Sequence, residues 1–151
     1  MEESPETRAV AFTINTEITT IAISTATKVF LFDYSSPDEF NLVTVRNVPN
    51  VTYIILIEVF VILLIDHEDF SEASLVCFEI DEEEPKAKID IKKFLQQKVI
   101  IRGGEESVFF ATGTQLGAIM VPDMELLYQE DTGHTGAIVD FAISKTCIFT
   151  T

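Results

Sequence analysis

Tryptophan is absent from this sequence of 151 residues, and basic residues, histidine and cysteine are scarce. Ten Lys and Arg stand against 25 Asp and Glu, which gives a formal net charge of −15. Such a surface repels phosphate backbones and anionic lipid heads, so we expect no nucleic-acid partner. The only cysteines, Cys77 and Cys147, lie in apolar runs. We interpret them as small buried residues of a protein in a reducing compartment, and expect a cytoplasmic location.

The sequence also lacks an apolar run long enough for a membrane-spanning helix, which needs about 20 residues. The longest candidate, Val51–Ile65, has 15 residues, is rich in β-branched side chains and contains Glu58 near its centre. Two successive buried strands explain it better. Residues 1–7 have neither the basic nor the apolar region of a signal peptide. We expect residues 1–8 to form a flexible acidic N-terminus.

Isoleucine, valine, threonine and phenylalanine dominate the rest of the chain, and these residues favour strands. Short apolar runs recur between turn-forming residues and fall into four sets. The first two sets of predicted strands are Ala9–Thr13, Ile18–Ser24, Lys28–Tyr34, Phe40–Arg46 and Val51–Ile57, Phe60–Asp66, Ala73–Ile80, Lys86–Ile91. The third set and the shorter fourth are Lys98–Arg102, Ser107–Thr112, Leu116–Val121, Leu126–Gln129 and Ala137–Ser144, Cys147–Thr151.

The four sets repeat with a period in the forties. An aspartate ends each of the first three third strands, at Asp33, Asp81 and Asp123, with spacings of 48 and 42 residues. Four strands in such a period indicate propeller blades. We therefore predict an all-β fold, a partial β-propeller of about three and a half four-stranded WD-repeat-like blades. The propeller domain spans 9–151, with blades at about 9–47, 51–92, 97–132 and an incomplete 137–151. A single sandwich or barrel of ten to fourteen strands is the alternative.

The repeats resemble those of the WD-repeat family. Phe32-Asp33, Ile80-Asp81 and Pro122-Asp123 stand where that family has its Trp-Asp pair. Gly133-His134 resembles the Gly-His pair that opens a repeat, and it precedes a predicted inner strand. In that family the histidine bonds to an aspartate in the turn between the second and third strands. The corresponding turn here would lie beyond Thr151.

Within propellers, the order of segments is similar to the first blades of PROPPINs, the phosphoinositide-binding propellers of autophagy. The segments that carry this likeness are Val10-Ala11-Phe12 with Ile18–Ser24 and Lys28-Val29-Phe30, Phe60–Ile65 with Ser74–Phe78, and Leu116–Val121 with Met124–Tyr128. The diagnostic Phe-Arg-Arg-Gly motif is missing, and Arg102-Gly103-Gly104 is the nearest string. If the likeness extends to function, a membrane phosphoinositide would therefore bind through residues outside this chain.

The candidates for catalytic or metal chemistry are weak. Asp66-His67-Glu68-Asp69 could coordinate a divalent cation, but its spacing matches neither a His-Glu-x-x-His motif nor a calcium loop. His134 is better explained as a turn residue than as a general base, because no nucleophile is recognisably placed with it. Gly103-Gly104, Gly113 and Gly117 lack the pattern of a phosphate-binding loop. We predict no catalytic, cofactor-binding or metal site, no cofactor and no enzymatic activity.

Two charged stretches have solvated structural explanations. Five lysines lie close together, and we interpret them as one edge of a sheet exposed to water. They are Lys86, Lys88, Lys92, Lys93 and Lys98. Glu82-Glu83-Glu84-Pro85 is predicted to connect the third and outer strands of a blade, with attraction of a basic partner as the functional alternative.

Three functional hypotheses follow. The first is a non-enzymatic protein-interaction scaffold, since a propeller offers two loop faces and a broad rim for docking. The second is a diverged PROPPIN-like protein of membranes and autophagy, and the third is an enzyme with an unrecognised site. Three and a half blades leave sheet edges unpaired. We therefore expect a longer protein, a partner that supplies the missing blades, or a second copy of the chain.

Overall fold

The computed structural model describes residues 9–14, 19–36, 39–66, 71–93, 98–144 and 148–151, and every regular element within them is a β-strand. The all-β prediction is therefore confirmed, while the predicted flexible N-terminus lies outside the described residues. The strands are β1 (Ala9–Ile14), β2 (Thr19–Ser24), β3 (Val29–Ser36), β4 (Glu39–Arg46), β5 (Val51–Ile57), β6 (Phe60–Asp66), β7 (Glu72–Glu79), β8 (Ala87–Lys92), β9 (Val99–Gly103), β10 (Ser107–Thr112), β11 (Gln115–Met120), β12 (Glu125–Asp131), β13 (Phe141–Ile143) and β14 (Ile148–Thr150).

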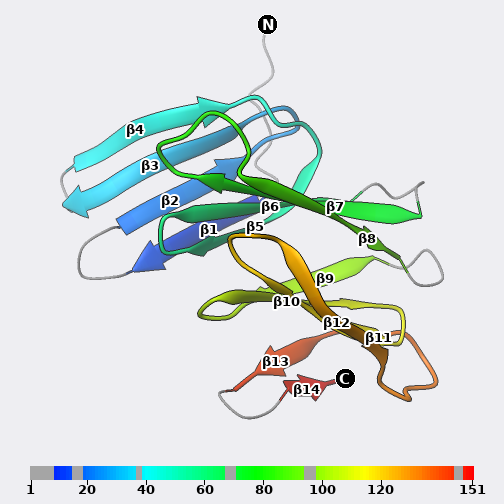
Figure 1. Cartoon of the computed structure of the whole chain (residues 1–151). Helices are drawn as coiled ribbons and strands as arrows, with labels where there is room; N and C mark the ends of the chain where they lie inside the picture. Colours follow the sequence, from blue (N-terminus) through cyan, green and yellow to red (C-terminus); the bar gives the residue numbers. More distant parts are fainter. Residues whose placement is uncertain (1–8, 15–18, 37–38, 67–70, 94–97, 145–147) are drawn as a thin grey trace, which may run out of the picture.

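These strands form four antiparallel sheets, each a simple meander (Figure 1). Sheet 1 comprises β1–β4, sheet 2 comprises β5–β8, sheet 3 comprises β9–β12, and sheet 4 comprises β13 and β14. Strand β5 contacts both β1 and β9, so the first strands of the sheets lie side by side. Each fourth strand is consequently on the outside. This radial stack of four-stranded meanders is the partial propeller that the sequence predicts.

Sheet 2 shows why the blades must stack. Along β6, Val61 and Leu63 belong to the cluster shared with sheet 1, whereas Ile62 and Leu64 belong to the cluster shared with sheet 3. Side chains of a strand alternate between the faces of its sheet, so apolar residues at every position mean that both faces are buried. The continuous apolar run of β5 and β6 is therefore the sequence of a central blade.

The same run settles the membrane question raised by the sequence. It folds as two strands joined at Glu58, whose φ of 52° allows a tight hairpin. In the part of the chain that the structure describes, no helix is long and apolar enough to cross a membrane.

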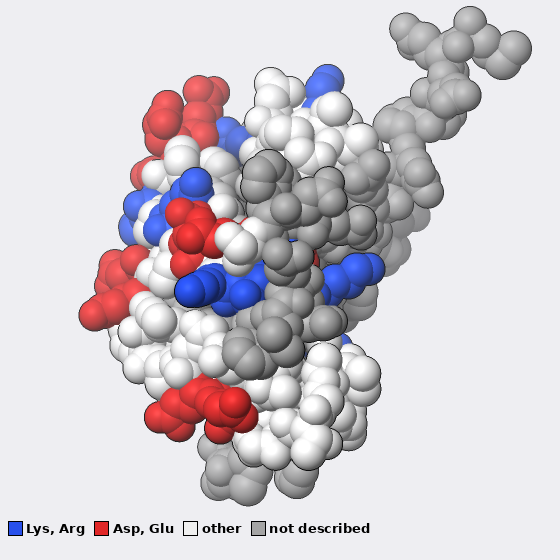
Figure 2. All heavy atoms as spheres, turned by 90° about the vertical axis from the view of Figure 1, so that its right-hand side faces the viewer, with Lys and Arg blue, Asp and Glu red and all other residues white. Residues whose placement is uncertain are grey.

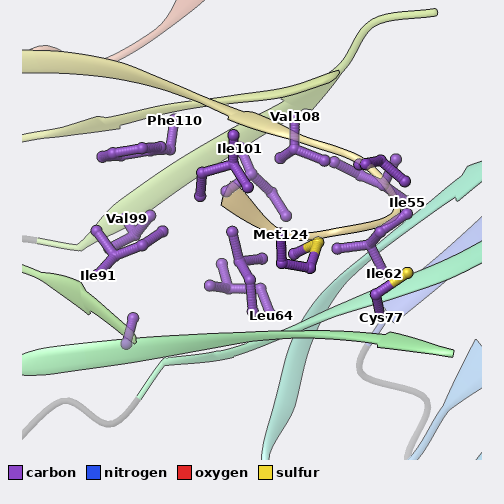
Figure 3. Close-up of a cluster of buried hydrophobic side chains, with 14 of the residues drawn as sticks. Ile55, Ile62, Leu64, Cys77, Ile91, Val99, Ile101, Val108, Phe110 and Met124 are labelled. Carbon is purple, nitrogen blue, oxygen red and sulfur yellow. The ribbon is translucent and has the colours of Figure 1, made fainter. Parts of the chain in front are cut away.

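The largest core cluster lies between sheets 2 and 3 (Figure 3). Phe110 of β10 is fully buried there, opposite Gly117 of β11 in the strand register. A Cβ atom on Gly117 would lie 2.8 Å from the carbonyl oxygen of Tyr128 and would also collide with the Phe110 ring. Glycine at this position thus makes room for the aromatic ring, as the close approach of a backbone to a side chain requires.

Sheet 4 covers part of the far face of sheet 3. Ala111, Ile138 and Phe141 form a small buried cluster there. The inner strand β13 is shorter than the predicted Ala137–Ser144, because the backbone before it makes other bonds. Ile138 N–H donates to the Gly113 carbonyl at 2.7 Å, and Val139 N–H donates to the Thr151 carbonyl at 2.8 Å.

The outer strands of sheets 1 and 3 share an irregularity. In sheet 1, Leu31 pairs with Thr44 and Phe32 with Leu42, so Val43 is an extra residue in β4. In sheet 3, Ala118 pairs with Tyr128 and Ile119 with Leu126, which makes Leu127 the extra residue in β12. Each is a β-bulge, which bends the strand locally. Strand β8 of sheet 2 pairs with β7 without such a shift.

The aspartates used to find the repeat do not occupy equivalent places. Asp81 follows β7 and Asp123 follows β11, as predicted, but Asp33 lies inside β3. Strand β3 continues to Ser36 because its pairing with β4 extends to a Ser36–Glu39 pair.

Candidate docking site

One face of sheet 1 has no sheet packed against it among the described residues. The face toward sheet 2 carries Ala22, Val29 and Leu31, all buried. The opposite face is also apolar. Its members follow from the strand register, since side chains of directly paired residues point the same way. We call it the open face, and its described side chains include Ile21, Ile23, Phe30, Phe32, Leu42 and Val45, with Tyr34 at the next alternate position of β3.

The open face is organised as two rows across the sheet. Ile23 pairs with Phe30, which pairs with Val45, and Ile21 pairs with Phe32, which pairs with Leu42. The Phe30 and Phe32 rings are stacked with centroids 6.5 Å apart. Leu42 is 54% exposed and Val45 38%, whereas Leu63 in the covered interior is 1% exposed. A patch of this composition, without formal charge, is characteristic of an interaction surface.

Arginine side chains link neighbouring sheets at two interfaces. Arg46 of β4 lies over the Phe78 ring of sheet 2 at 6.0 Å, and its guanidinium donates to the Ile80 carbonyl at 3.4 Å and to the Glu82 carbonyl. Such a contact combines cation–π attraction with charge-assisted hydrogen bonds. These bonds fix the edge of sheet 1 against sheet 2.

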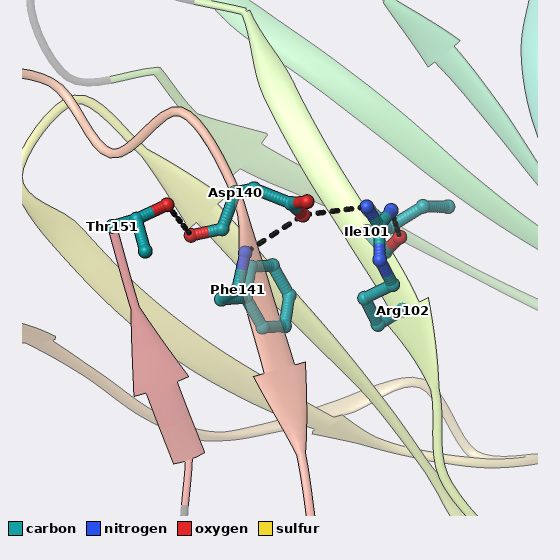
Figure 4. Close-up of polar contacts among 5 residues, drawn as sticks. All are labelled: Ile101, Arg102, Asp140, Phe141 and Thr151. Atoms are coloured by element: carbon teal, nitrogen blue, oxygen red, sulfur yellow. Dashed lines mark hydrogen bonds and ion pairs between the residues drawn. The ribbon is translucent and has the colours of Figure 1, made fainter.

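Arg102 makes the corresponding link between sheets 3 and 4 (Figure 4). Its Nη2 lies 2.7 Å from Oδ1 of Asp140, and the guanidinium carbon is 5.7 Å from the centre of the Phe141 ring. The same Asp140 oxygen accepts a hydrogen bond from the Phe141 N–H at 2.8 Å. The Asp140 carbonyl oxygen accepts one from the Thr151 hydroxyl at 3.4 Å. Sheet 4 is therefore anchored at its first strand.

One lysine of the predicted exposed edge is instead buried. Lys93 follows β8, its side chain is 1% exposed, and its ammonium forms an ion pair with Asp66, whose side chain is 9% exposed. The second Asp66 oxygen accepts the Val99 N–H at 3.1 Å. Asp66 thus joins the end of β6 to the start of β9, and burial of the lysine requires this partner. The prediction was wrong for Lys93, while Lys86, Lys88, Lys92 and Lys98 are exposed.

Gly133 and His134 lie in the exposed connection between β12 and β13, before the inner strand of sheet 4. Gly133 has a φ of 81°, which favours glycine, and its N–H donates to Asp131 at 2.8 Å. His134 Nε2 lies 2.6 Å from the Thr150 hydroxyl of β14. The histidine therefore connects the turn to the second strand of the incomplete blade.

Cys77 is a remaining candidate for chemistry that lies within the described residues. Cys77 is buried in the core, and desolvation raises the pKa of its thiol to about 11, which makes it unreactive at neutral pH. No group of three metal-ligating side chains occurs within the described part of the chain. His67, Glu68, Asp69 and Cys147 lie outside the described residues.

Carboxylates gather at one end of the sheets. Connections between first and second strands and between third and fourth strands lie at the same end of a meander. The exposed acidic residues there are Glu58, Asp81, Glu82, Glu83, Glu84, Glu105, Glu106 and Asp123. The predicted role of 82–85 as a connection between third and outer strands agrees with its place between β7 and β8. Figure 2 shows another side of the molecule, where basic side chains gather in a band across its middle.

No protein-family model and no curated protein sequence matches the chain. Two solved structures of Hsv2, a PROPPIN with a β-propeller fold, do match. Hsv2 of Kluyveromyces marxianus superimposes with a TM-score of 0.66 over 96% of this chain and 41% of its own, at 7% identity. Hsv2 of Kluyveromyces lactis with its complete loop 6CD gives a TM-score of 0.58 over 88% and 41%, at 14% identity.

The chain has a PROPPIN-like propeller fold. At these identities the likeness concerns the fold alone, and the chain spans about 41% of the length of each matched structure. The PROPPIN-like fold bears out both the predicted partial propeller and the family resemblance seen in the segment order.

The sequence analysis predicted unpaired sheet edges but did not identify the open face. The signal was present in Val29-Phe30-Leu31-Phe32, where apolar residues at successive positions require two covered faces. The Asp66–Lys93 pair had no such signal, because its members are 27 positions apart in a charge-rich stretch.

Proposed function

We propose that this chain is a non-enzymatic protein-interaction module built on propeller blades. The observation that carries the proposal is the open face of sheet 1. It has the composition of the faces buried between sheets 1, 2 and 3, and yet Leu42 and Val45 are exposed. Burying apolar surface yields about 25 cal/mol per Å², which favours a protein partner at this face.

The module positions this face rigidly. Sheet 1 is held against sheet 2 by a buried apolar cluster and by the contacts of Arg46 with sheet 2. A preformed face loses little conformational freedom on binding, and that lowers the free-energy cost of association. The stack of blades therefore serves as a scaffold that presents one docking surface.

A charge placed on the open face tests the proposal. In the double variant Leu42→Lys and Val45→Lys, we expect at least a tenfold loss of affinity for proteins that bind the wild-type chain, because two ammonium groups would be desolvated in the interface. Leu126→Lys is the matched control, since Leu126 is 45% exposed on an outer strand with the same bulge but lies outside the open face.

The measurement is affinity capture on immobilised chain, followed by titration of each purified binder in a calorimeter. Binders retained by the wild type and by Leu126→Lys, and lost by the double variant, support the proposal. Equal retention by all three chains would contradict it.

A second candidate is a diverged PROPPIN-like role at membranes in autophagy, which the fold likeness to Hsv2 favours. Because the Phe-Arg-Arg-Gly motif is missing, we expect this chain alone to show no binding to vesicles of phosphatidylcholine with phosphatidylinositol 3-phosphate. Saturable binding in a flotation assay would place a lipid site within these residues.

A further inference from the structure

We infer that a groove at the junction of sheets 2 and 3 binds an acidic peptide segment of a partner protein in extended form. The groove consists of two hollows that meet at the ion pair between Asp66 and Lys93, since Asp66 lines one hollow and Lys93 lines the other. It is separate from the open face of sheet 1. The inference therefore goes beyond the proposed docking function and can fail independently of it.

The outer hollow lies toward the outer strands β8 and β12 and has a volume of about 450 Å³, within the range of ligand sites in proteins. Its lining residues are Lys92, Lys93, Gln115 and Gln129. Gln129 Nε2 donates a hydrogen bond to Gln115 Oε1 at 2.7 Å. This bond leaves the Gln115 amino group as a donor and the Gln129 carbonyl oxygen as an acceptor for a ligand. A main-chain peptide group offers the complementary acceptor and donor.

The inner hollow lies at the first strands β5 and β9 and has a volume of about 250 Å³. A β-bulge shapes it. Val51 pairs with Ile65. The next pair is Tyr53 with Leu64, so Thr52 is an extra residue in β5. A bulge re-aims side chains, and here Thr52 and Tyr53 are both exposed although they are neighbours in a strand. The Tyr53 ring, 41% exposed, offers an apolar face to a bound side chain.

Two ammonium groups in the groove are available to a ligand. Lys92 lines the outer hollow and Lys98 the inner one, and both are exposed. Neither forms an ion pair within the described part of the chain, although Glu72 is opposite Lys92 in the strand register. The charge of Lys93, in contrast, is compensated by Asp66. The end of β8 and the start of β9 lie on the right-hand side of Figure 1, and Figure 2 shows the basic band on that side.

The charges favour a short acidic segment over an extended polyanion. At physiological ionic strength the Debye length is about 8 Å, so the two ammonium groups act on carboxylates bound beside them. Asp131 pairs with Gln115 in the register, and its carboxylate oxygens already accept two hydrogen bonds. Beyond the groove, the formal net charge of −15 repels the many phosphates of a nucleic acid or an anionic membrane. A peptide with a few carboxylates satisfies the lysines and the glutamine pair together.

A peptide array tests the inference. Heptapeptides that carry two glutamates at every pair of positions, among alanine, serine and phenylalanine, are probed with the labelled full chain. Matched arrays carry glutamine or lysine in place of glutamate. The tightest glutamate peptide is then titrated by fluorescence anisotropy. We expect it to bind at least tenfold more tightly than its glutamine analogue, because the two ammonium groups attract the carboxylates.

Two double variants show where this peptide binds. We expect Lys92→Gln with Lys98→Gln to weaken its binding at least tenfold. The matched control, Lys86→Gln with Lys88→Gln, removes the same charge from exposed lysines of the same stretch that lie outside the groove, and it should change the affinity by about twofold or less. All four lysines are exposed, so both variants should keep the far-UV circular dichroism spectrum of the wild type.

Nuclear magnetic resonance provides the second readout. We expect the peptide to shift the side-chain amide signals of Gln115 and Gln129 and the backbone signal of Tyr53, and to leave the signal of Glu83 unchanged. Glutamate-dependent affinity that is lost in the groove variant, together with these shifts, supports the inference.

The other outcomes separate the groove from the open face. Equal binding of glutamate and glutamine peptides, or equal affinities of the groove variant and its control, would overturn the inference. A peptide lost by Leu42→Lys with Val45→Lys but retained by the groove variant would overturn it and leave the proposed docking function standing. Tighter, lysine-dependent binding of phosphatidylserine vesicles or of an oligonucleotide would assign the groove to another polyanion and overturn it as well.

Discussion

Sheets 1 and 2 are built from the same residue types, but they meet different surroundings. Sheet 2 packs against sheet 1 through Val61, Leu63, Val76 and Phe78, and against sheet 3 through Ile62, Leu64, Leu75 and Cys77. Among the described residues, sheet 1 packs against sheet 2 through one face, and its other face is the open face. The comparison shows that the open face has the composition of a face that is covered within the stack.

The difference also separates stability from recognition. In sheet 2, apolar side chains on both faces are buried, and their burial stabilises the folded state. On the open face of sheet 1, side chains of the same types remain available to a partner, and their burial would contribute to the binding free energy instead. Substitutions on the buried faces of sheet 2 should therefore lower stability, whereas substitutions on the open face of sheet 1 should weaken binding.

The largest expected effect concerns the ion pair between Asp66 and Lys93 in sheet 2, whose carboxylate also accepts a hydrogen bond from Val99 of sheet 3. Lys93→Met should lower the free energy of unfolding by about 3–5 kcal/mol, because it leaves the Asp66 carboxylate buried without its counter-charge. Urea denaturation followed by far-UV circular dichroism measures this change. The control, Lys92→Met, alters the exposed neighbouring lysine and should change the stability by less than about 0.5 kcal/mol. Equal effects of the two variants would show that the ion pair is not the cause.

A matched pair of leucines tests the comparison directly. Leu75→Ala in sheet 2 should cost about 2–5 kcal/mol, because it leaves a cavity in a fully buried site. Leu42→Ala on the open face should cost less than about 0.5 kcal/mol in the isolated chain. Both values come from urea denaturation. A cost for Leu42→Ala as large as that for Leu75→Ala would mean that the face is already covered in solution.

A smaller effect should appear at high pH. Burial raises the pKa of Cys77 from 9.0 to about 11, so the folded protein keeps the thiol protonated where the unfolded chain has lost the proton. This contribution to stability is complete below pH 9 and is lost as the pH rises to 11, by roughly 2–3 kcal/mol. Stability measured between pH 8 and 11 should fall less steeply in Cys77→Ala. Parallel curves for the two proteins would contradict the buried, protonated thiol.

The sequence was a good guide to the fold, and physical reasons explain where it was not. The period of four strands and the apolar run of β5 and β6 identified stacked blades, because burial of both faces leaves a clear pattern. The predicted extent of β13 was wrong, since residues 138–140 bond to Gly113 and Thr151, and these contacts depend on the three-dimensional arrangement.

The candidate site was harder to predict than the fold. Apolar residues of the open face and of the covered faces look alike in sequence, so only the stack shows which face is left over. The buried position of Lys93 was also hidden, because an isolated lysine in a charged stretch is normally exposed. The Asp66 carboxylate that accounts for its burial lies on another strand.

The extra residues Val43 and Leu127 in the outer strands bear on the behaviour of the protein at high concentration. A bent rim strand cannot serve as a template for an incoming chain in continuous register, which is how cross-β fibrils begin. Strand β8 is regular, but Lys88, Asp90 and Lys92 project from it into water, and a stacked copy would bring like charges together. The rim thus resists polymerisation by shape in two sheets and by charge in the third, so among the described strands the open face of sheet 1 is the surface where ordered assembly would start.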